Sequence, residues 1–326
     1  MAGRFSAIRS FAASHKWLVV ALQVAVLAVF LGFVGWAMHG SFHAAGDDLR
    51  NANPVLFTLA CVALAGYYLV FVLGWIRILA DWNIHLSYPA ALRAEMVSML
   101  AKYVPGGVWT PAARVVAARR AGVTDGALVT ASMLLEAGIS AVAGVLVFVV
   151  SLAWVDGVEA PIAPLVAFAV VVAILLQPPV FRPVVSRVLR RLGYAALPPL
   201  RRTTMLVLLV FYSGTWVIGG SALWLLLRSV GSHPDVESIV FLGGVAAVGA
   251  IVAVLSFFAP SGLGPREASM YGLMLAITSQ GAALGATVLN RVAITLVEVL
   301  LLVVGGLLLR SRDDPSEPAR LRDAEA

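Results

Sequence analysis

The stretch Lys102–Trp109, KYVPGGVW, places a proline and two glycines inside a weak helical pattern, shortly before a basic run that ends at Arg120. Proline removes a backbone donor and glycine weakens a helix, so this segment predicts a break between two helices. At membrane depth the freed N–H and C=O groups must face protein or water, because lipid cannot satisfy them. The stretch therefore predicts a re-entrant hairpin or, alternatively, a turn between two helices at the membrane interface.

The composition around this break is that of a membrane protein. Of 326 residues, 61% are hydrophobic and only 12% are charged, whereas a globular domain has about 25% charged residues. The net charge of +6 comes from arginines between apolar segments, which indicates membrane topology and lipid-headgroup contact and excludes nucleic acid as the expected partner. Cys61, the only cysteine, lies in an apolar run, so we expect neither a disulfide nor a thiolate metal site.

Apolar segments long enough to cross a bilayer, which takes about 20 residues, predict six transmembrane helices. They are Trp17–Met38, Pro54–Leu79, Ala127–Val155, Pro161–Leu176, Thr204–Leu227 and Leu284–Leu309. Two weaker stretches, Tyr88–Gly122 and Ser238–Gln280, carry breaks. We therefore predict an all-α polytopic fold of six transmembrane helices and two re-entrant helical hairpins, although full crossing of both broken stretches satisfies the same topology.

The loops predict the orientation and the division of the chain. Arginines and Lys16 gather before the first helix, after the first broken stretch, around Arg182–Arg202 and after the last helix, so both termini are expected in the cytoplasm. We predict a cytoplasmic N-terminus at 1–16, a membrane domain at 17–309 and a charged cytoplasmic tail at 310–326. Within the membrane domain, we predict that 17–155 and 161–309 repeat one order of helices with opposite sidedness, as in transporters built from inverted repeats; the alternative is chance similarity between Gly- and Ala-rich helices.

A second break, PSGLGPREAS, matches the first. Pro260, Gly262 and Gly264 interrupt an apolar stretch directly before Arg266 and Glu267, at a predicted helix start. Ionisable groups at membrane depth are costly and generally mark a pathway or a site. The alternative is an exposed loop with a surface ion pair.

Further ionisable residues lie inside predicted spans. Glu136 is about ten residues into its helix, and Arg291 and Glu298 are two turns apart on one face. Lys102 and Arg114 lie beside the first break, which consists of Pro105, Gly106 and Gly107. The predicted headgroup or pathway residues are all of these ionisable residues: Lys102, Arg114, Glu136, Arg266, Glu267, Arg291 and Glu298. The two glutamates would take up protons or balance the arginines while a phosphate passes; the alternative is a structural buried salt bridge.

The first span ends in a pattern that resembles a metal site, because His39, His43 and Asp47 are spaced by four residues. Polar residues are expected at that position in any case, so we predict no metal ion. Asp47 and Asp48 also fit the acidic outer loop of a membrane glycosyltransferase. The sequence contains no nucleotide-binding glycine motif and no Ser-His-Asp pattern, so we expect no cofactor and no ATP hydrolysis.

The two break motifs resemble the membrane domain of bacterial lysylphosphatidylglycerol synthases, a flippase-like family that also occurs as stand-alone proteins. The resemblance rests on KYVPGGVW with Arg114 and Gly122, on Glu136, and on PSGLGPREA, and it spans roughly Trp17 to Leu309. In place of the usual hydrophobic residue before Arg-Glu, this chain has Pro265, which is expected to stiffen the helix start. No soluble aminoacyl-transfer domain follows Leu309 here, so lysyl transfer is not expected.

What the resemblance implies is a cytoplasmic-membrane lipid translocase that moves a phosphate-bearing lipid, a phospholipid or a polyprenyl-phosphate-linked lipid, between leaflets. Arg114, Glu136, Arg266 and Glu267 would be its pathway residues. Two alternatives stay open: a polyprenyl-phosphate glycosyltransferase that uses Asp47 or Asp48, and a non-transporting partner in a cell-envelope complex.

Overall fold

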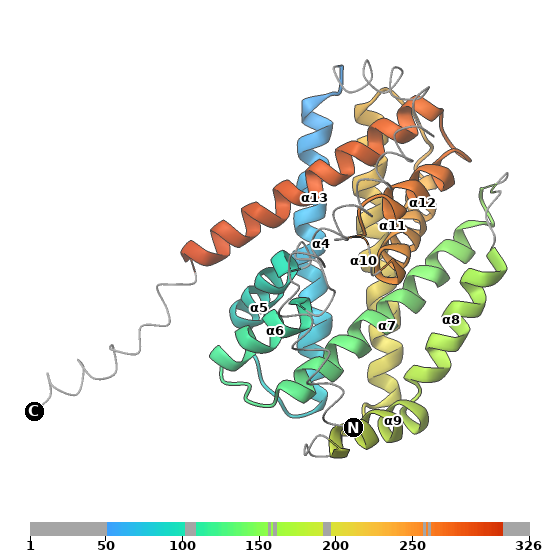
Figure 1. The fold of residues 1–326 in the computed structure, drawn as a ribbon. Helices are drawn as coiled ribbons and strands as arrows, with labels where there is room; N and C mark the ends of the chain where they lie inside the picture. Colours follow the sequence, from blue (N-terminus) through green and yellow to red (C-terminus); the bar gives the residue numbers. More distant parts are fainter. Residues whose placement is uncertain are drawn as a thin grey trace, which may run out of the picture.

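Within the residues that the computed structural model describes, 51–101, 109–155, 158, 162–191, 197–256, 259 and 262–308, the fold is helical and contains no strand (Figure 1). The helices are α4 (Pro54–Asp81), α5 (Tyr88–Ala101), α6 (Trp109–Arg120), α7 (Gly126–Ser151), α8 (Ile162–Leu176), α9 (Pro178–Arg191), α10 (Arg202–Ser229), α11 (Ser238–Leu255), α12 (Pro265–Met274) and α13 (Gln280–Leu308). The predicted all-α fold is confirmed.

Five helices, α4, α7, α10, α11 and α13, are long and apolar enough to cross a membrane, and α8 with α9 makes a sixth candidate that bends by 70°. The predicted spans correspond to these helices, apart from Trp17–Met38, which lies outside the described residues. α11 differs from expectation. Its 18 residues are by themselves long and apolar enough to cross a membrane, whereas the sequence predicted that they belong to a broken hairpin. An uninterrupted apolar run precedes the break at Ser256, and it is this run that forms α11.

The centre of the bundle is α10, which packs against α4, α7 and α11. Small residues let the backbones approach at the contact with α11: a Cβ on Gly220 would lie 2.8 Å from Gly243 Cα, and one on Gly243 would lie 2.6 Å from the Trp216 carbonyl oxygen. Close backbone approach of this kind is how membrane helices gain packing energy, since lipid provides no hydrophobic drive between them. The α10–α11 crossing therefore fixes α11, and with it the break that follows.

This crossing gives a stability prediction with an adjacent control. Gly220→Ala is expected to lower the unfolding free energy by about 1–3 kcal/mol, the usual cost of overpacking, because the new methyl meets backbone atoms that cannot move aside. Gly219→Ala is expected to be neutral or slightly stabilising, since a Cβ there meets nothing within 4 Å. The two variants are compared by thermal unfolding in detergent, with the folded fraction measured by size-exclusion chromatography. Equal unfolding midpoints for Gly220→Ala and Gly219→Ala would contradict the assignment of this contact.

Both predicted breaks separate helices that pack on each other, α5 with α6 and α11 with α12. The first break, including Lys102, Pro105, Gly106 and Gly107, lies outside the described residues, as does Pro260. At the second break Gly262 and Gly264 adopt φ angles of 67° and 91°, which only glycine adopts readily. Whether the hairpins are re-entrant, and whether the halves 17–155 and 161–309 form an inverted repeat, remain predictions, and the segments 1–16 and 310–326 are not described.

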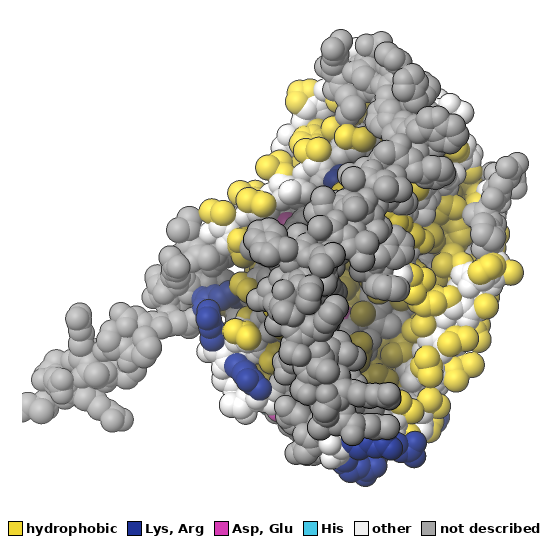
Figure 2. All heavy atoms as spheres, in the orientation of Figure 1, with side chains coloured by type: hydrophobic (Ala, Val, Ile, Leu, Met, Phe, Trp, Pro, Cys, Tyr) yellow, Lys and Arg dark blue, Asp and Glu magenta, His cyan; other side chains and the backbone are white. Residues whose placement is uncertain are grey.

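The visible face of the molecule carries apolar side chains over most of its described surface, while most of its visible Lys and Arg side chains lie toward one end (Figure 2). Basic residues close α6, with Arg119 and Arg120, and α9, with Arg190 and Arg191. Such one-sided charge is what the positive-inside rule describes. We therefore expect this end of the bundle to face the cytoplasm.

Candidate functional site

The first cluster of buried charges surrounds Arg114 on α6. Its Nη2 pairs with Glu95 of α5, and its Nη1 donates a 2.6 Å hydrogen bond to Oε2 of Glu136 on α7. Its Nε donates to Ser98 Oγ at 3.2 Å. The side chains of Arg114, Glu95 and Glu136 are all at most 5% exposed. One guanidinium thus holds three helices together through two carboxylates and a hydroxyl.

Aromatic side chains enclose this cluster. The Trp75 ring lies 4.9 Å from the Arg114 guanidinium carbon and donates its indole N–H to Ser132 Oγ at 2.8 Å. Tyr212 of α10 donates its hydroxyl to Glu136 Oε1 at 3.3 Å. A cation–π contact and hydrogen bonds of this kind stabilise charges that burial would otherwise penalise. The donors of Arg114 are therefore largely occupied within the protein.

Glycine makes room for one of these contacts. A Cβ on Gly74 would meet the ring and hydroxyl of Tyr212, with Cε1 at 3.0 Å. Because α4 has no side chain at this point, the Tyr212 hydroxyl can pass it and reach Glu136. Gly74 is thus a structural requirement of the Arg114 cluster.

The second cluster lies at the start of α12. Gly264 donates its backbone N–H to Glu267 Oε2 at 2.7 Å, and Arg291 of α13 pairs with Glu267 Oε1 at 3.4 Å. Pro265 occupies the first helical turn, as expected from its fixed φ. The alternative from the sequence is an exposed loop with a surface ion pair. In the structure Glu267 binds Gly264 and the half-buried Arg291, and it does not pair with its neighbour Arg266.

Arg266 is the exception among these charged groups. Its side chain is half-buried, its Cγ lies 3.4 Å from the Cβ position of Gly249 on α11, and within the described part of the chain it has no ion pair. A guanidinium with this setting has donors available for an anion.

Each of the two buried glutamates in the predicted spans accepts a hydrogen bond from a tyrosine of the other predicted half. Glu136, from the first predicted half, accepts from Tyr212 of the second, and Glu298, from the second half, accepts at 2.6 Å from Tyr68 of the first. Both hydrogen bonds are buried. Each half thus contributes one tyrosine to the other half's glutamate, an arrangement that an inverted repeat would produce.

A comparison with models of known protein families identifies the family of this chain. The family model of the lysylphosphatidylglycerol synthase transmembrane region matches residues 20–302 of this chain. The chain belongs to that family. A comparison with curated proteins finds no match. The family predicted from the two break motifs is thus confirmed, and with the apolar helices it makes this chain a multi-pass membrane protein with a lipid-related membrane domain.

Several residues of the site in this lysylphosphatidylglycerol synthase family member were not predicted from its sequence. They are Tyr68, Trp75, Glu95, Ser98, Ser132 and Tyr212. The pairing of Glu95 with Arg114 could have been found from the sequence. Glu95 lies ten residues before Pro105, and Arg114 lies nine residues after Pro105. In a hairpin that folds back at Pro105 such positions lie opposite each other, so the hairpin itself predicts their pairing.

Metal binding has no candidate group in the described residues. No set of three His, Cys, Asp or Glu side chains there is arranged to hold a metal ion. The weak pattern His39, His43 and Asp47 falls outside those residues, as does Asp48 of the glycosyltransferase alternative.

Proposed function

We propose that this chain is a lipid translocase of the bacterial cytoplasmic membrane, with both termini in the cytoplasm, which moves a phosphate-bearing lipid between leaflets. The observation that carries the proposal is Arg266: a half-buried cation in a membrane bundle without an ion pair to any described residue. A charge in this position is costly unless an anion compensates it. A phosphate headgroup supplies that anion, and the guanidinium fork fits its oxygens.

The surroundings of Arg266 suit the rest of such a lipid. An apolar cavity of about 1070 Å³ lies elsewhere, between α5 and α6, but a second one of about 730 Å³ lies between α7, α8, α11 and α12. Ser269 and Gly272, on the same helix as Arg266, line the second cavity together with Val248 and Val252 of α11. Arg266 itself does not line this cavity, so in the proposal the phosphate binds at Arg266 and the tails reach the cavity around α12.

The role of the Arg114 cluster in this proposal is structural support. Two carboxylates already engage Arg114, so a phosphate would have to displace one of them from a site that is almost fully buried. Breaking a buried ion pair costs about 3–5 kcal/mol. Arg114 accordingly holds α5, α6 and α7 together, while Arg266 contacts the cargo.

The proposal is tested with wild-type protein in vesicles. Lipids with a fluorophore on the acyl chain and either a phosphate headgroup, phosphatidylglycerol, or a phosphate-free one, glucosylceramide, are added, and the reductant dithionite reports which leaflet they occupy. We expect transfer of phosphatidylglycerol to exceed that in protein-free vesicles at least tenfold, with glucosylceramide close to background. Transfer no faster than in protein-free vesicles, with and without a proton gradient and also for a polyprenyl-phosphate probe, would refute translocation.

A further inference from the structure

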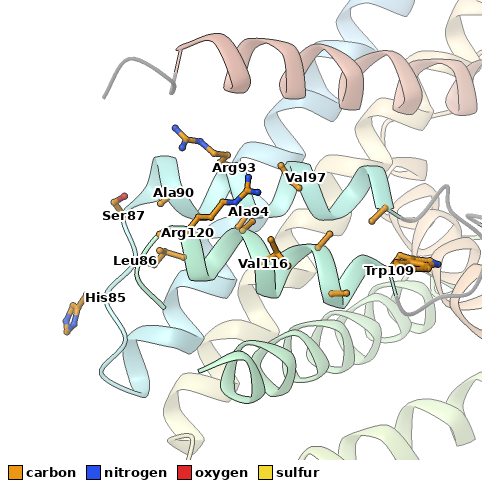
Figure 3. A pocket seen from close by; sticks show the side chains of 15 residues that line it. His85, Leu86, Ser87, Ala90, Arg93, Ala94, Val97, Trp109, Val116 and Arg120 are labelled. Carbon is orange, nitrogen blue, oxygen red and sulfur yellow. The ribbon is translucent and has the colours of Figure 1, made fainter. Parts of the chain in front are cut away.

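A long groove runs between α5 and α6, separate from the Arg114 cluster. Its volume is about 1070 Å³, and alanines form much of its wall: Ala90, Ala94, Ala101, Ala112, Ala113, Ala117 and Ala121. Figure 3 shows Arg93 and Arg120 at one end of the groove and Trp109 at the other. Small side chains on both helices keep the space between them open.

The groove opens away from the bundle core. Ser98 and Ala118, on the core side of the same two helices, are fully buried, whereas Val97 and Val116, which line the groove, are 39% and 51% exposed. Trp109 is 50% exposed. An exposed apolar surface of this kind is a contact surface, and the proposal below assigns lipid to it.

Charge distinguishes the two ends of the groove. Arg93, Arg120 and His85 line one end, and none of the described lining residues is acidic. Arg120 is exposed, and no described carboxylate pairs with it. Basic pockets between membrane helices at the cytoplasmic side favour anionic lipid headgroups. The charge at this end therefore complements a phosphate.

The length of the groove fits an acyl chain. Trp109 and Arg120 are the first and last of the 12 residues of α6, so they lie about 17 Å apart along the helix at a rise of about 1.5 Å per residue. One leaflet of the hydrocarbon core is about 15 Å thick, half of the whole. A lipid with its phosphate at Arg93 and Arg120 would thus extend one chain along the alanines as far as Trp109.

We propose that this groove holds one anionic phospholipid of the inner leaflet as a resident ligand. The lipid fills the gap between α5 and α6, and it stays in place while cargo passes at Arg266. The inference is independent of the proposed translocation, because it rests only on the shape and charge of the α5–α6 surface. Its test therefore measures binding and not transport.

The test uses the full chain in neutral detergent. Native mass spectrometry counts bound phosphatidylglycerol and phosphatidylcholine of identical acyl chains, and thermal unfolding reports stabilisation by each. All binding measurements are made in an Arg266→Gln background, which removes the proposed cargo contact. There we expect one phosphatidylglycerol per chain, which phosphatidylcholine or inorganic phosphate does not displace. Arg120→Gln is expected to weaken its affinity about fivefold, the effect of one arginine near an anionic headgroup, and Ala113→Phe to abolish binding by filling the groove.

Arg119→Gln is the matched control. Arg119 is the neighbouring exposed arginine of α6, but it lines a different cavity, toward α7 and α9, so its loss of charge should leave the affinity unchanged. Equal binding of both lipids, or equal effects of Arg119→Gln and Arg120→Gln, overturns the proposal. A dimer that dissociates in Ala113→Phe, with lipid binding unaltered, would instead assign the groove to a second copy of the chain.

Discussion

Arg114→Ala is expected to destabilise the fold by about 3–5 kcal/mol and to remove most of the correctly folded protein from the membrane. The guanidinium lies between Glu95 and Glu136, which are almost fully buried. Its removal leaves two carboxylates close together without their countercharge, and Ser98 loses a hydrogen bond. The measurement is the monodisperse fraction after detergent extraction, together with the midpoint of thermal unfolding.

A compensated variant separates the electrostatic explanation from simple loss of packing. Arg114→Met combined with Glu95→Gln and Glu136→Gln removes the charges but keeps most of the volume, so it is expected to recover much of the folded fraction. Arg119→Ala, an exposed arginine on the same helix, should stay within about 0.5 kcal/mol of wild type. An Arg114→Ala protein as stable as wild type would show that the cluster does not hold the helices together.

The sequence predicts the helices of this protein well because long apolar runs and Pro-Gly breaks act locally. Its prediction of side-chain partners is weaker. The seven-residue spacing of Arg291 and Glu298 places them on one face of α13 but does not say what that face contacts. In the structure Glu298 binds Tyr68 of α4, and Arg291 pairs with Glu267 of α12. Such partners depend on helix packing across distant segments, which the spacing alone does not encode.

The two arginines of the predicted pathway illustrate the same limit. Both follow a helix break, and the sequence assigned both to a lipid phosphate. Two carboxylates engage Arg114, and one of them, Glu95, lies in a weakly patterned helix. Glu267, although adjacent to Arg266, does not pair with it, because neighbouring residues of a helix point about 100° apart. The structure thus separates a supporting arginine from one with donors available for an anion.

Arg266→Gln is expected to slow transfer of phosphatidylglycerol roughly 10- to 100-fold, because a hydrogen bond to a charged group contributes about 1.5–3 kcal/mol. The protein should still fold, since Arg266 has no ion pair in the described part of the chain. Arg266→Lys keeps the charge but loses the bidentate fork, so its rate of lipid transfer should lie between those of wild type and Arg266→Gln.

The role of Arg266 is tested by comparing these variants with Arg202→Gln in the dithionite vesicle assay, at equal protein density. Arg202 is exposed at the start of α10, so its substitution removes the same charge away from Arg266. We expect a wild-type rate for Arg202→Gln and a loss of at least tenfold for Arg266→Gln. Equal rates for wild type and Arg266→Gln with every phosphate-bearing lipid that is transported would contradict a role of Arg266 in binding the headgroup.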